Sequence, residues 1–498
     1  MFSTAPLQTV FTVFQQIRVA DYSPAPIIAL IPFYFWFGEN RTAYITAIAV
    51  TYLIPAAAAS AILVTHVMKR RLTVSVFLLS LSLPAFWMPS LRGQPDIVGI
   101  IFLAAGTVLL FKSDFLSRRP LVYGAAIGLA VYAPFLLRRW YAYSIVLFFA
   151  SAFAVILWRG ISAGKPAKEM ISPILGLGVA GAVFAVLVMA LQWDLALRAV
   201  TTSYADLHSA YQTSFVEHLQ RVGGRISVYV GALTAIGAFI AVRNRNFEAI
   251  FCLLSAVGTF LLFTRTQYMG LHHSLPVFMW LLPLMCISIS SISRNTRLPM
   301  TAFAAFGMLI LAISLSPLAR NLGAAARIVI PYEDLTPLYL ENLAEYKSLA
   351  TDIERYASAG EKAAVFASSR DLSDSLLMSL NPNLKTTVIP APHIAATQGF
   401  PPELLDVDLA VVATPDQQHL APGSQENILT PGRWIIDGAG FGRAFVRKSE
   451  YHLQNGVTAF LYQKARPVTE EEKAQLLNEL ARLYPDHPSL FPTYGSSK

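Results

Sequence analysis

Asp96 stands where a polar turn meets a long apolar run, a position at which a carboxylate is unusual. A charged group at the start of a membrane-spanning run loses hydration, so it is expected to pair with a cation or to take part in a reaction. Arg92, one helical turn earlier, is the candidate partner. The structural alternative is that Asp96 caps the first amides of the following helix, and the functional one is contact with a substrate or acceptor.

Arginines are concentrated in short turns that share a predicted membrane face with Asp96. Arg138 and Arg139 lie in a turn too short to form a solvated domain, and Arg265 lies in a similar turn. Arginine presents a planar fork of donors that suits phosphate or carboxylate, whereas lysine is a point charge. These three residues and Arg92 therefore predict an anion-binding cavity. The alternative is that each arginine anchors the chain among the lipid head groups.

Two further segments on the same face supply polar side chains that could hold a sugar or a phosphate. One turn carries Gln267, His272 and His273, and a longer loop contributes Tyr204 and Asp206. Adjacent histidines on one helix point in different directions, so this pair is a poor joint metal ligand. Hydrogen bonding to a sugar or a phosphate is the favoured role. A lone metal site is the weaker alternative, and no cofactor is predicted.

The composition of the chain is that of an α-helical polytopic membrane protein. Hydrophobic residues make up 55% of the 498 residues and charged residues 14%, against roughly 25% charged in soluble globular domains. A cytosolic enzyme, a disordered scaffold and a disulfide framework are thereby excluded. The shorter run Pro26–Phe37 predicts an interfacial or re-entrant helix. Ten runs have about the length needed to cross a bilayer: 43–67, 72–88, 97–111, 121–137, 142–158, 171–191, 226–242, 248–263, 274–292 and 299–316.

The cations between these runs alternate in number, which predicts the orientation of the chain. Loops with 13 cations, four of them lysine, are assigned to the cytoplasmic face by the positive-inside rule. Trp140 and Tyr141 fit an aromatic belt at the opposite interface. Ten spans then leave both termini outside, which suits a multi-pass protein of the bacterial cytoplasmic membrane. The outer face keeps nine cations, all arginine: Arg18, Arg41, Arg92, Arg138, Arg139, Arg198, Arg221, Arg225 and Arg265.

The last part of the chain, residues 317–498, predicts a soluble α/β domain outside the cytoplasm. It holds 16 cations and 21 acidic residues and has no long apolar run. The segment contains no glycine-rich phosphate loop and no metal cluster, so its expected role is a lid or an acceptor-docking domain. It follows an N-terminal outer segment, 1–42, and a membrane domain, 43–316. Its predicted elements are strands at 362–369, 386–389 and 409–414, a hairpin at 444–461, and helices at 341–358 and 468–484.

Several outer motifs together resemble the GT-C superfamily of membrane glycosyltransferases, nearest to protein-mannosyltransferase-like and RgtA/B/C/D-like bacterial proteins. The resemblance covers residues 1–316 and extends only loosely to the tail. It implies transfer of a sugar from a polyprenyl-phosphate-linked donor to a glycan, lipid or protein acceptor, with membrane lipids but no nucleic acid as partners. The segments that carry it are Asp21–Pro24 with the short helix after it, Phe37–Arg41, Arg92–Asp96, Arg138–Tyr141 and Arg265–His273.

In that superfamily an acid in the first outer loop orients or deprotonates the acceptor hydroxyl, and cations hold the departing phosphate. The sequence departs from this pattern because it begins within that loop, so the first span and the usual acid are absent. Asp21 or Asp96 is then the candidate catalytic acid, unless the natural start lies upstream. A transporter or flippase and a non-catalytic binding subunit for a lipid-linked glycan are the alternatives. The spans hold few ionisable residues at mid-depth, which favours chemistry at one face over transport.

Overall fold

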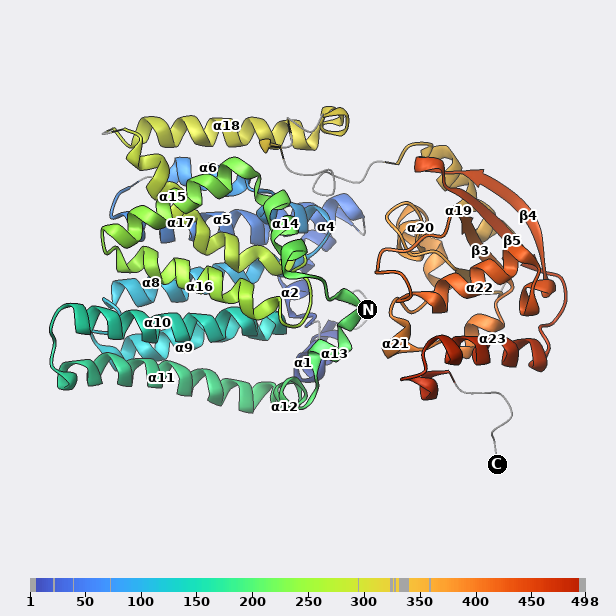
Figure 1. The fold of residues 1–498 in the computed structure, drawn as a ribbon, viewed down its shortest axis with the longest axis horizontal. Helices are drawn as coiled ribbons and strands as arrows, with labels where there is room; N and C mark the ends of the chain where they lie inside the picture. The colour runs from blue at the N-terminus through green and yellow to red at the C-terminus, as the bar shows by residue number, and fades with distance from the viewer. Residues whose placement is uncertain are drawn as a thin grey trace. The chain divides into compact units, whose positions relative to one another are not determined.

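The computed structural model describes the chain apart from residues 1–5, 21–22, 39, 72, 294, 323–325, 327, 331–339, 358–359 and 492–498. The chain forms two compact units, Met1–Pro337 and Leu338–Lys498 (Figure 1). The first unit is helical, and the second combines helices with a small sheet. Each unit has its own buried apolar core.

The first unit contains the apolar helices expected of a membrane protein. Among the described residues, seven helices are long and apolar enough to cross a membrane, or up to nine if each of two bent pairs is one span. The helices are α1 (Pro6–Val19), α2 (Ala25–Ile28), α3 (Ile31–Phe37), α4 (Arg41–Ile48), α5 (Ile54–Met68), α6 (Thr73–Ser82), α7 (Pro84–Leu91), α8 (Val98–Lys112), α9 (Pro120–Leu137), α10 (Ala142–Ser162), α11 (Ala167–Leu191), α12 (Trp193–Thr201), α13 (Tyr204–Leu207), α14 (Phe215–Ile226), α15 (Val228–Arg243), α16 (Phe247–Phe263), α17 (Leu275–Ser291) and α18 (Arg297–Leu315).

Two bent pairs and one shorter helix explain why the count falls below the ten runs predicted from the sequence. Helices α6 and α7 meet at 58°, and α14 and α15 meet at 101°. Leu83 is extended because Pro84 follows it, and Ser227 has a positive φ of 60°. The run predicted at 248–263 forms α16, whose 17 residues make it shorter than the other candidates. Ten spans remain a prediction.

The short N-terminal apolar run forms two helices, α2 and α3, rather than one. A turn at Leu30 separates them, and Pro26 and Pro32 open them. Phe35, Trp36 and Phe37 of α3 are exposed. Aromatic side chains without protein cover at the end of a membrane domain suit the interface between lipid and water. This arrangement agrees with an interfacial element.

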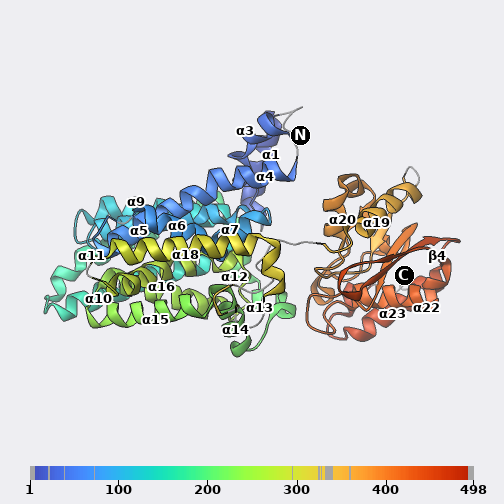
Figure 2. The same cartoon turned by 90° about the horizontal axis from the view of Figure 1, so that it is seen from above.

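The helices of the first unit pack around one apolar core. Helix α9 lies between α8 and α11, α15 packs on α17, and α18 lies beside α6 (Figures 1 and 2). Trp280 on α17 and Phe148 on α10 are fully buried in this core. The core therefore joins the helices whose ends carry the site described below.

The second unit is built on a five-stranded sheet with the order β2-β1-β3-β5-β4. The first three strands in this order run parallel, and β5 is antiparallel to both β3 and β4. The strands form where the sequence predicts them, although β1 and β2 are shorter than expected and the hairpin continues to Lys464. The elements are α19 (Leu343–Tyr356), β1 (Ala363–Val365), α20 (Asp374–Leu380), β2 (Val388–Ile389), α21 (Ala395–Gln398), β3 (Leu409–Thr414), α22 (Glu426–Asp437), β4 (Phe445–His452), β5 (Thr458–Lys464) and α23 (Glu470–Leu483).

Helices cover both faces of this sheet. On one face Leu377 of α20 joins a cluster with Val365 and α19. On the other face α22 and α23 pack with Val412, as does Leu404 from the β2–β3 connection. The connection from β1 to β2 therefore runs over one face and that from β2 to β3 over the other. Because β1 lies between β2 and β3, the chain reverses its direction of winding there.

Candidate functional site

Asp96 lines a cavity of about 350 Å³ at one end of the helical unit. It belongs to the 3₁₀ turn η2 (Pro95–Ile97), which opens the span that continues as α8. Only 4% of Asp96 is exposed. The lining residues are Ser23, Ile27, Tyr44, Gly93, Gln94, Pro95, Asp96, Arg138 and His272.

One carboxylate oxygen of Asp96 accepts two hydrogen bonds. Arg138 Nε and Trp140 Nε1 both donate to Oδ1, each over 3.0 Å. The second oxygen, Oδ2, has no hydrogen-bond partner among the described residues. A buried ion pair is stable only with good geometry and further hydrogen bonds, which Trp140 supplies here. The carboxylate is thus fixed in orientation with one oxygen left to meet a ligand.

The turn that follows α9 brings Arg138, Trp140 and Tyr141 to Asp96. Arg138 has an extended backbone, and η3 (Arg139–Tyr141) follows it directly. The Tyr141 hydroxyl donates to the Asp96 carbonyl oxygen over 2.9 Å. A Cβ atom on Gly99 would lie 2.4 Å from the Tyr141 ring, so only glycine at that position lets the two segments approach this closely.

The structure contradicts three predictions made from the sequence for this turn. The partner of Asp96 is Arg138, 42 residues away, rather than Arg92. Asp96 does not cap a helix, because its side chain accepts from Arg138 and Trp140 and the cap positions fall on Gln94 and Ile97. Trp140 and Tyr141 are buried against Asp96 and do not form an exposed aromatic belt.

The N-terminal helices close one side of the cavity. Arg138 Nη1 donates to the Ser23 carbonyl oxygen over 2.7 Å. The Tyr52 hydroxyl donates to the Pro26 carbonyl oxygen, and the Tyr44 hydroxyl donates to that of Gly93 over 3.2 Å. The same guanidinium therefore holds both the catalytic candidate and the segment that covers it.

His272 and His273 lie on the 3₁₀ turn η5 (His272–Ser274), and their rings are adjacent, with centroids 3.9 Å apart. The expectation that they point apart is wrong, because the two rings contact each other although they stand on consecutive residues. His272 lines the cavity, whereas His273 packs against Phe263 and accepts from the Gly270 amide. Among the described residues, no group of three or more histidine, cysteine or acidic side chains is placed to hold a metal ion.

Arg139 contacts Tyr204, the first residue of helix α13. Its Nη1 donates to the Tyr204 hydroxyl over 2.5 Å, and its Cζ lies 4.5 Å from the centre of the Tyr204 ring. Tyr204 stacks on His208 at 6.1 Å. Tyr268 in the turn after α16 contacts Tyr211 at 5.7 Å, which joins this loop to the turn before His272.

The remaining predicted site residues do not line the cavity. Arg92, Arg265 and Asp206 are exposed, and Gln267 is half-buried. Asp21 lies outside the described residues, so its predicted role stays a prediction.

Comparison with protein-family models, with curated proteins and with solved structures finds no match for this chain. The site must therefore be interpreted from its own geometry.

Four contributors to the site were not predicted as such: Ser23, Tyr44, Trp140 and Tyr141. Ser23 and the aromatic pair belong to two of the predicted outer motifs, Asp21–Pro24 and Arg138–Tyr141. An aromatic residue near the end of a span has the same sequence signature whether it faces lipid or the protein interior, so the pattern alone did not separate the two.

Proposed function

We propose that the helical unit transfers a sugar from a polyprenyl-phosphate-linked donor to an acceptor hydroxyl at the outer face of the bacterial cytoplasmic membrane. The observation that carries the proposal is that only one of the two carboxylate oxygens of Asp96 accepts hydrogen bonds from the described residues. Its Oδ1 is held by Arg138 and Trp140, Oδ2 has no hydrogen-bond partner among the described residues, and Asp96 lines a cavity of about 350 Å³. An acceptor oxygen held in a fixed orientation beside a cavity suits the alignment of a hydroxyl nucleophile.

In this mechanism the acceptor hydroxyl donates to Oδ2 of Asp96. Its oxygen bonds to the anomeric carbon of the sugar as its proton passes to the carboxylate. The bond between that carbon and the phosphate oxygen breaks, and the polyprenyl phosphate leaves with the electron pair. A positioned carboxylate of this kind contributes about 100-fold to 10,000-fold to a proton transfer.

Arg138 has two roles in the same step. Before reaction its charge balances that of Asp96, with 3.0 Å between Nε and Oδ1. Once Asp96 takes up the proton, the guanidinium charge is no longer balanced by the carboxylate. It then stabilises the negative charge that develops on the leaving phosphate. The cost of separating charge is therefore reduced at both ends of the reacting system.

Transport of a lipid-linked glycan is the competing function from another class. Carriers place their ionisable groups near the membrane midplane. Asp96 is instead the second residue of the 18-residue span Pro95–Lys112, and its partner Arg138 follows directly after the span Pro120–Leu137. The charges thus gather at one end of the helices, which favours chemistry at a surface.

The test uses the purified full chain in proteoliposomes with a polyprenyl-phosphate-linked radiolabelled hexose and lipid extracted from the protein's native membrane. We expect label to move from the donor to an acceptor that is resistant to mild acid. Two results would overturn the proposal. Movement of the intact donor across the bilayer without transfer indicates a flippase, and donor binding without either process indicates a binding subunit.

A further inference from the structure

The second unit has a group of polar side chains at the carboxyl ends of its three parallel strands. Ser368 follows β1, His393 follows β2 and His419 follows β3. The chain reverses its direction of winding between β1 and β3, as the two apolar clusters show. In open α/β sheets, ligands bind outside the carboxyl ends of the strands at such a reversal.

Ser368 lies within hydrogen-bond distance of both histidine rings. Its Oγ lies 2.8 Å from His393 Nδ1 and 3.0 Å from His419 Nδ1. His419 Nδ1 is also 2.9 Å from the Ser368 carbonyl oxygen, which can only accept. His419 therefore carries its hydrogen on Nδ1, which leaves a lone pair on Nε2. Because Ser368 is buried and His419 is exposed, the rings rather than the serine are placed to meet a ligand.

The buried side chain of one glutamine connects the loop that carries His393 to the loop that carries His419 through hydrogen bonds. Gln425, which is fully buried, accepts from the His419 amide over 2.9 Å through Oε1. Its Nε2 donates to the His393 carbonyl oxygen over 3.1 Å. Each histidine is thus fixed both through its ring and through its backbone. Sites whose groups are fixed before binding lose less conformational entropy when a ligand arrives.

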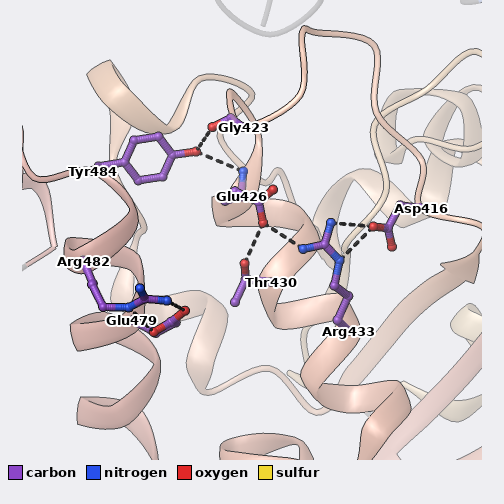
Figure 3. Close-up of polar contacts among 8 residues, drawn as sticks. All are labelled: Asp416, Gly423, Glu426, Thr430, Arg433, Glu479, Arg482 and Tyr484. Carbon is purple, nitrogen blue, oxygen red and sulfur yellow. Dashed lines mark hydrogen bonds and ion pairs between the residues drawn. The ribbon is translucent and has the colours of Figure 1, made fainter.

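The loop that carries His419 is also tied down at both of its ends (Figure 3). At its start, Asp416 accepts from Arg433 of α22, with Oδ2 at 2.8 Å from Nε and 2.6 Å from Nη2. Near its end, the Gly423 carbonyl oxygen accepts from the Tyr484 hydroxyl over 2.5 Å. These ties keep the loop in place with no help from a ligand.

Two buried amide oxygens in the same region lack a donor among the described residues: Gln418 Oε1 and Asn427 Oδ1. Gln418 lies next to His419 in sequence. Asn427 is fully buried, and its Nδ2 donates over 2.8 Å to the carbonyl oxygen of Pro392, the neighbour of His393. A buried acceptor without a donor is rare and calls for a partner.

The group consists of side chains that can both donate and accept hydrogen bonds. Burial lowers the pKa of His419, which favours its uncharged form, and the hydrogen bond to the Ser368 carbonyl oxygen partly opposes this lowering. Neutral imidazole, hydroxyl and amide groups both donate and accept hydrogen bonds, as sugar hydroxyls do. Phosphate binding, by contrast, calls for cations or a row of amides.

We propose that the carboxyl edge of this sheet is a carbohydrate-binding site, in which His393 and His419 bind the hydroxyls of a neutral sugar unit. The site is separate from the Asp96 cavity and does not depend on the proposed transfer reaction.

The test applies the full chain in detergent to an array of neutral oligosaccharides, with inorganic phosphate as a competitor. The test variants are His393→Asn and His419→Asn, because asparagine keeps an amide near the Nδ1 position beside Ser368 and removes Nε2. The matched control is Arg482→Ala, which removes an exposed ion pair with Glu479 on α23 (Figure 3).

We expect the wild type and the control to bind at least one neutral glycan class, and the double asparagine variant to bind it about tenfold or more weakly. Two results would overturn the proposal: no neutral glycan bound by the wild type, or equal binding by the double variant. Competition by millimolar phosphate would also contradict it, because an anion site would then be present. Asp96→Asn is expected to leave this binding unchanged, which separates the proposal from the transfer reaction.

Discussion

Trp140 and Asp96 are joined by a hydrogen bond of 3.0 Å between the indole Nε1 and the carboxylate Oδ1. The same oxygen accepts from Arg138, so the indole does not replace the ion pair but adds to it. This arrangement leaves Oδ2 without a hydrogen-bond partner among the described residues, on a residue that lines the cavity. An indole that the sequence would place among lipid head groups is instead part of the candidate site.

Trp140→Phe is expected to lower the stability of the helical unit by about 2 kcal/mol, because a hydrogen bond to a charged group is lost while the apolar volume is largely kept. Thermal unfolding in detergent would measure the effect. Trp36→Phe is the control, since Trp36 on α3 is exposed and bonds to no carboxylate among the described residues. Equal melting temperatures for the two variants would show that the indole does not support Asp96.

Gly99→Ala is expected to destabilise the unit by about 1–3 kcal/mol, since the added Cβ would lie 2.4 Å from the Tyr141 ring. The ring would have to move and would release the Asp96 carbonyl oxygen. Gly178→Ala on α11 is the matched helical control, because a Cβ there meets nothing within 4 Å. A stability loss for Gly178→Ala as large as that for Gly99→Ala would contradict the steric explanation.

Arg139→Ala is expected to loosen the loop around Tyr204, because a hydrogen bond of 2.5 Å and a stacked guanidinium are lost together. Removing about 1 kcal/mol of local stability speeds amide exchange about fivefold. Hydrogen–deuterium exchange of residues 203–211 would show the change. Arg265→Ala serves as the control, since Arg265 is exposed. Unchanged exchange in the Arg139 variant would show that Arg139 does not stabilise the loop around Tyr204.

In the second unit, Thr469→Ala is expected to cost α23 about 1 kcal/mol. Thr469 and Glu472 form a capping box, in which each side chain bonds to the backbone amide of the other. Hydrogen exchange at the first amides of α23 would report the loss. Unaltered exchange there would mean that the cap does not hold the helix start.

The stability that Glu472 contributes is expected to depend on pH. Hydrogen bonds from Arg466 lower the pKa of Glu472 to about 2. A carboxylate whose folded pKa is depressed stabilises the fold above its unfolded pKa of about 4.3, and this contribution fades as the pH falls toward 2. The difference in melting temperature between the wild type and Glu472→Gln should therefore shrink between pH 5 and pH 2. A difference that stays constant over that range would refute the assignment.

Much of the fold follows from the sequence because apolar length and strand pattern are local properties. The bends at Leu83 and Ser227 were less evident, since a continuous apolar run conceals a break in direction. Asp96 and Arg138 were singled out because a charge beside a span is costly wherever it lies. Their pairing was not predicted, because it joins positions 42 residues apart.

The group formed by Ser368, His393 and His419 could not be predicted from the sequence for a different reason. Each residue is ordinary in its own segment, and the three come together only because β1 lies between β2 and β3. Strand order is a property of the whole sheet. The sequence predicted the strands but did not specify their order, so it gave no sign of this site.

The most direct test of the central claim compares sugar transfer by the wild type and by Asp96→Asn in the same proteoliposomes. Asparagine keeps an oxygen that can accept from Arg138 and Trp140 but removes the charge that pairs with Arg138, so thermal unfolding in detergent must first show that the variant is folded. Because asparagine cannot take up the acceptor proton, turnover is expected to fall by about 100-fold or more while donor affinity stays within about twofold. Transfer at the wild-type rate by a folded Asp96→Asn protein would contradict the account.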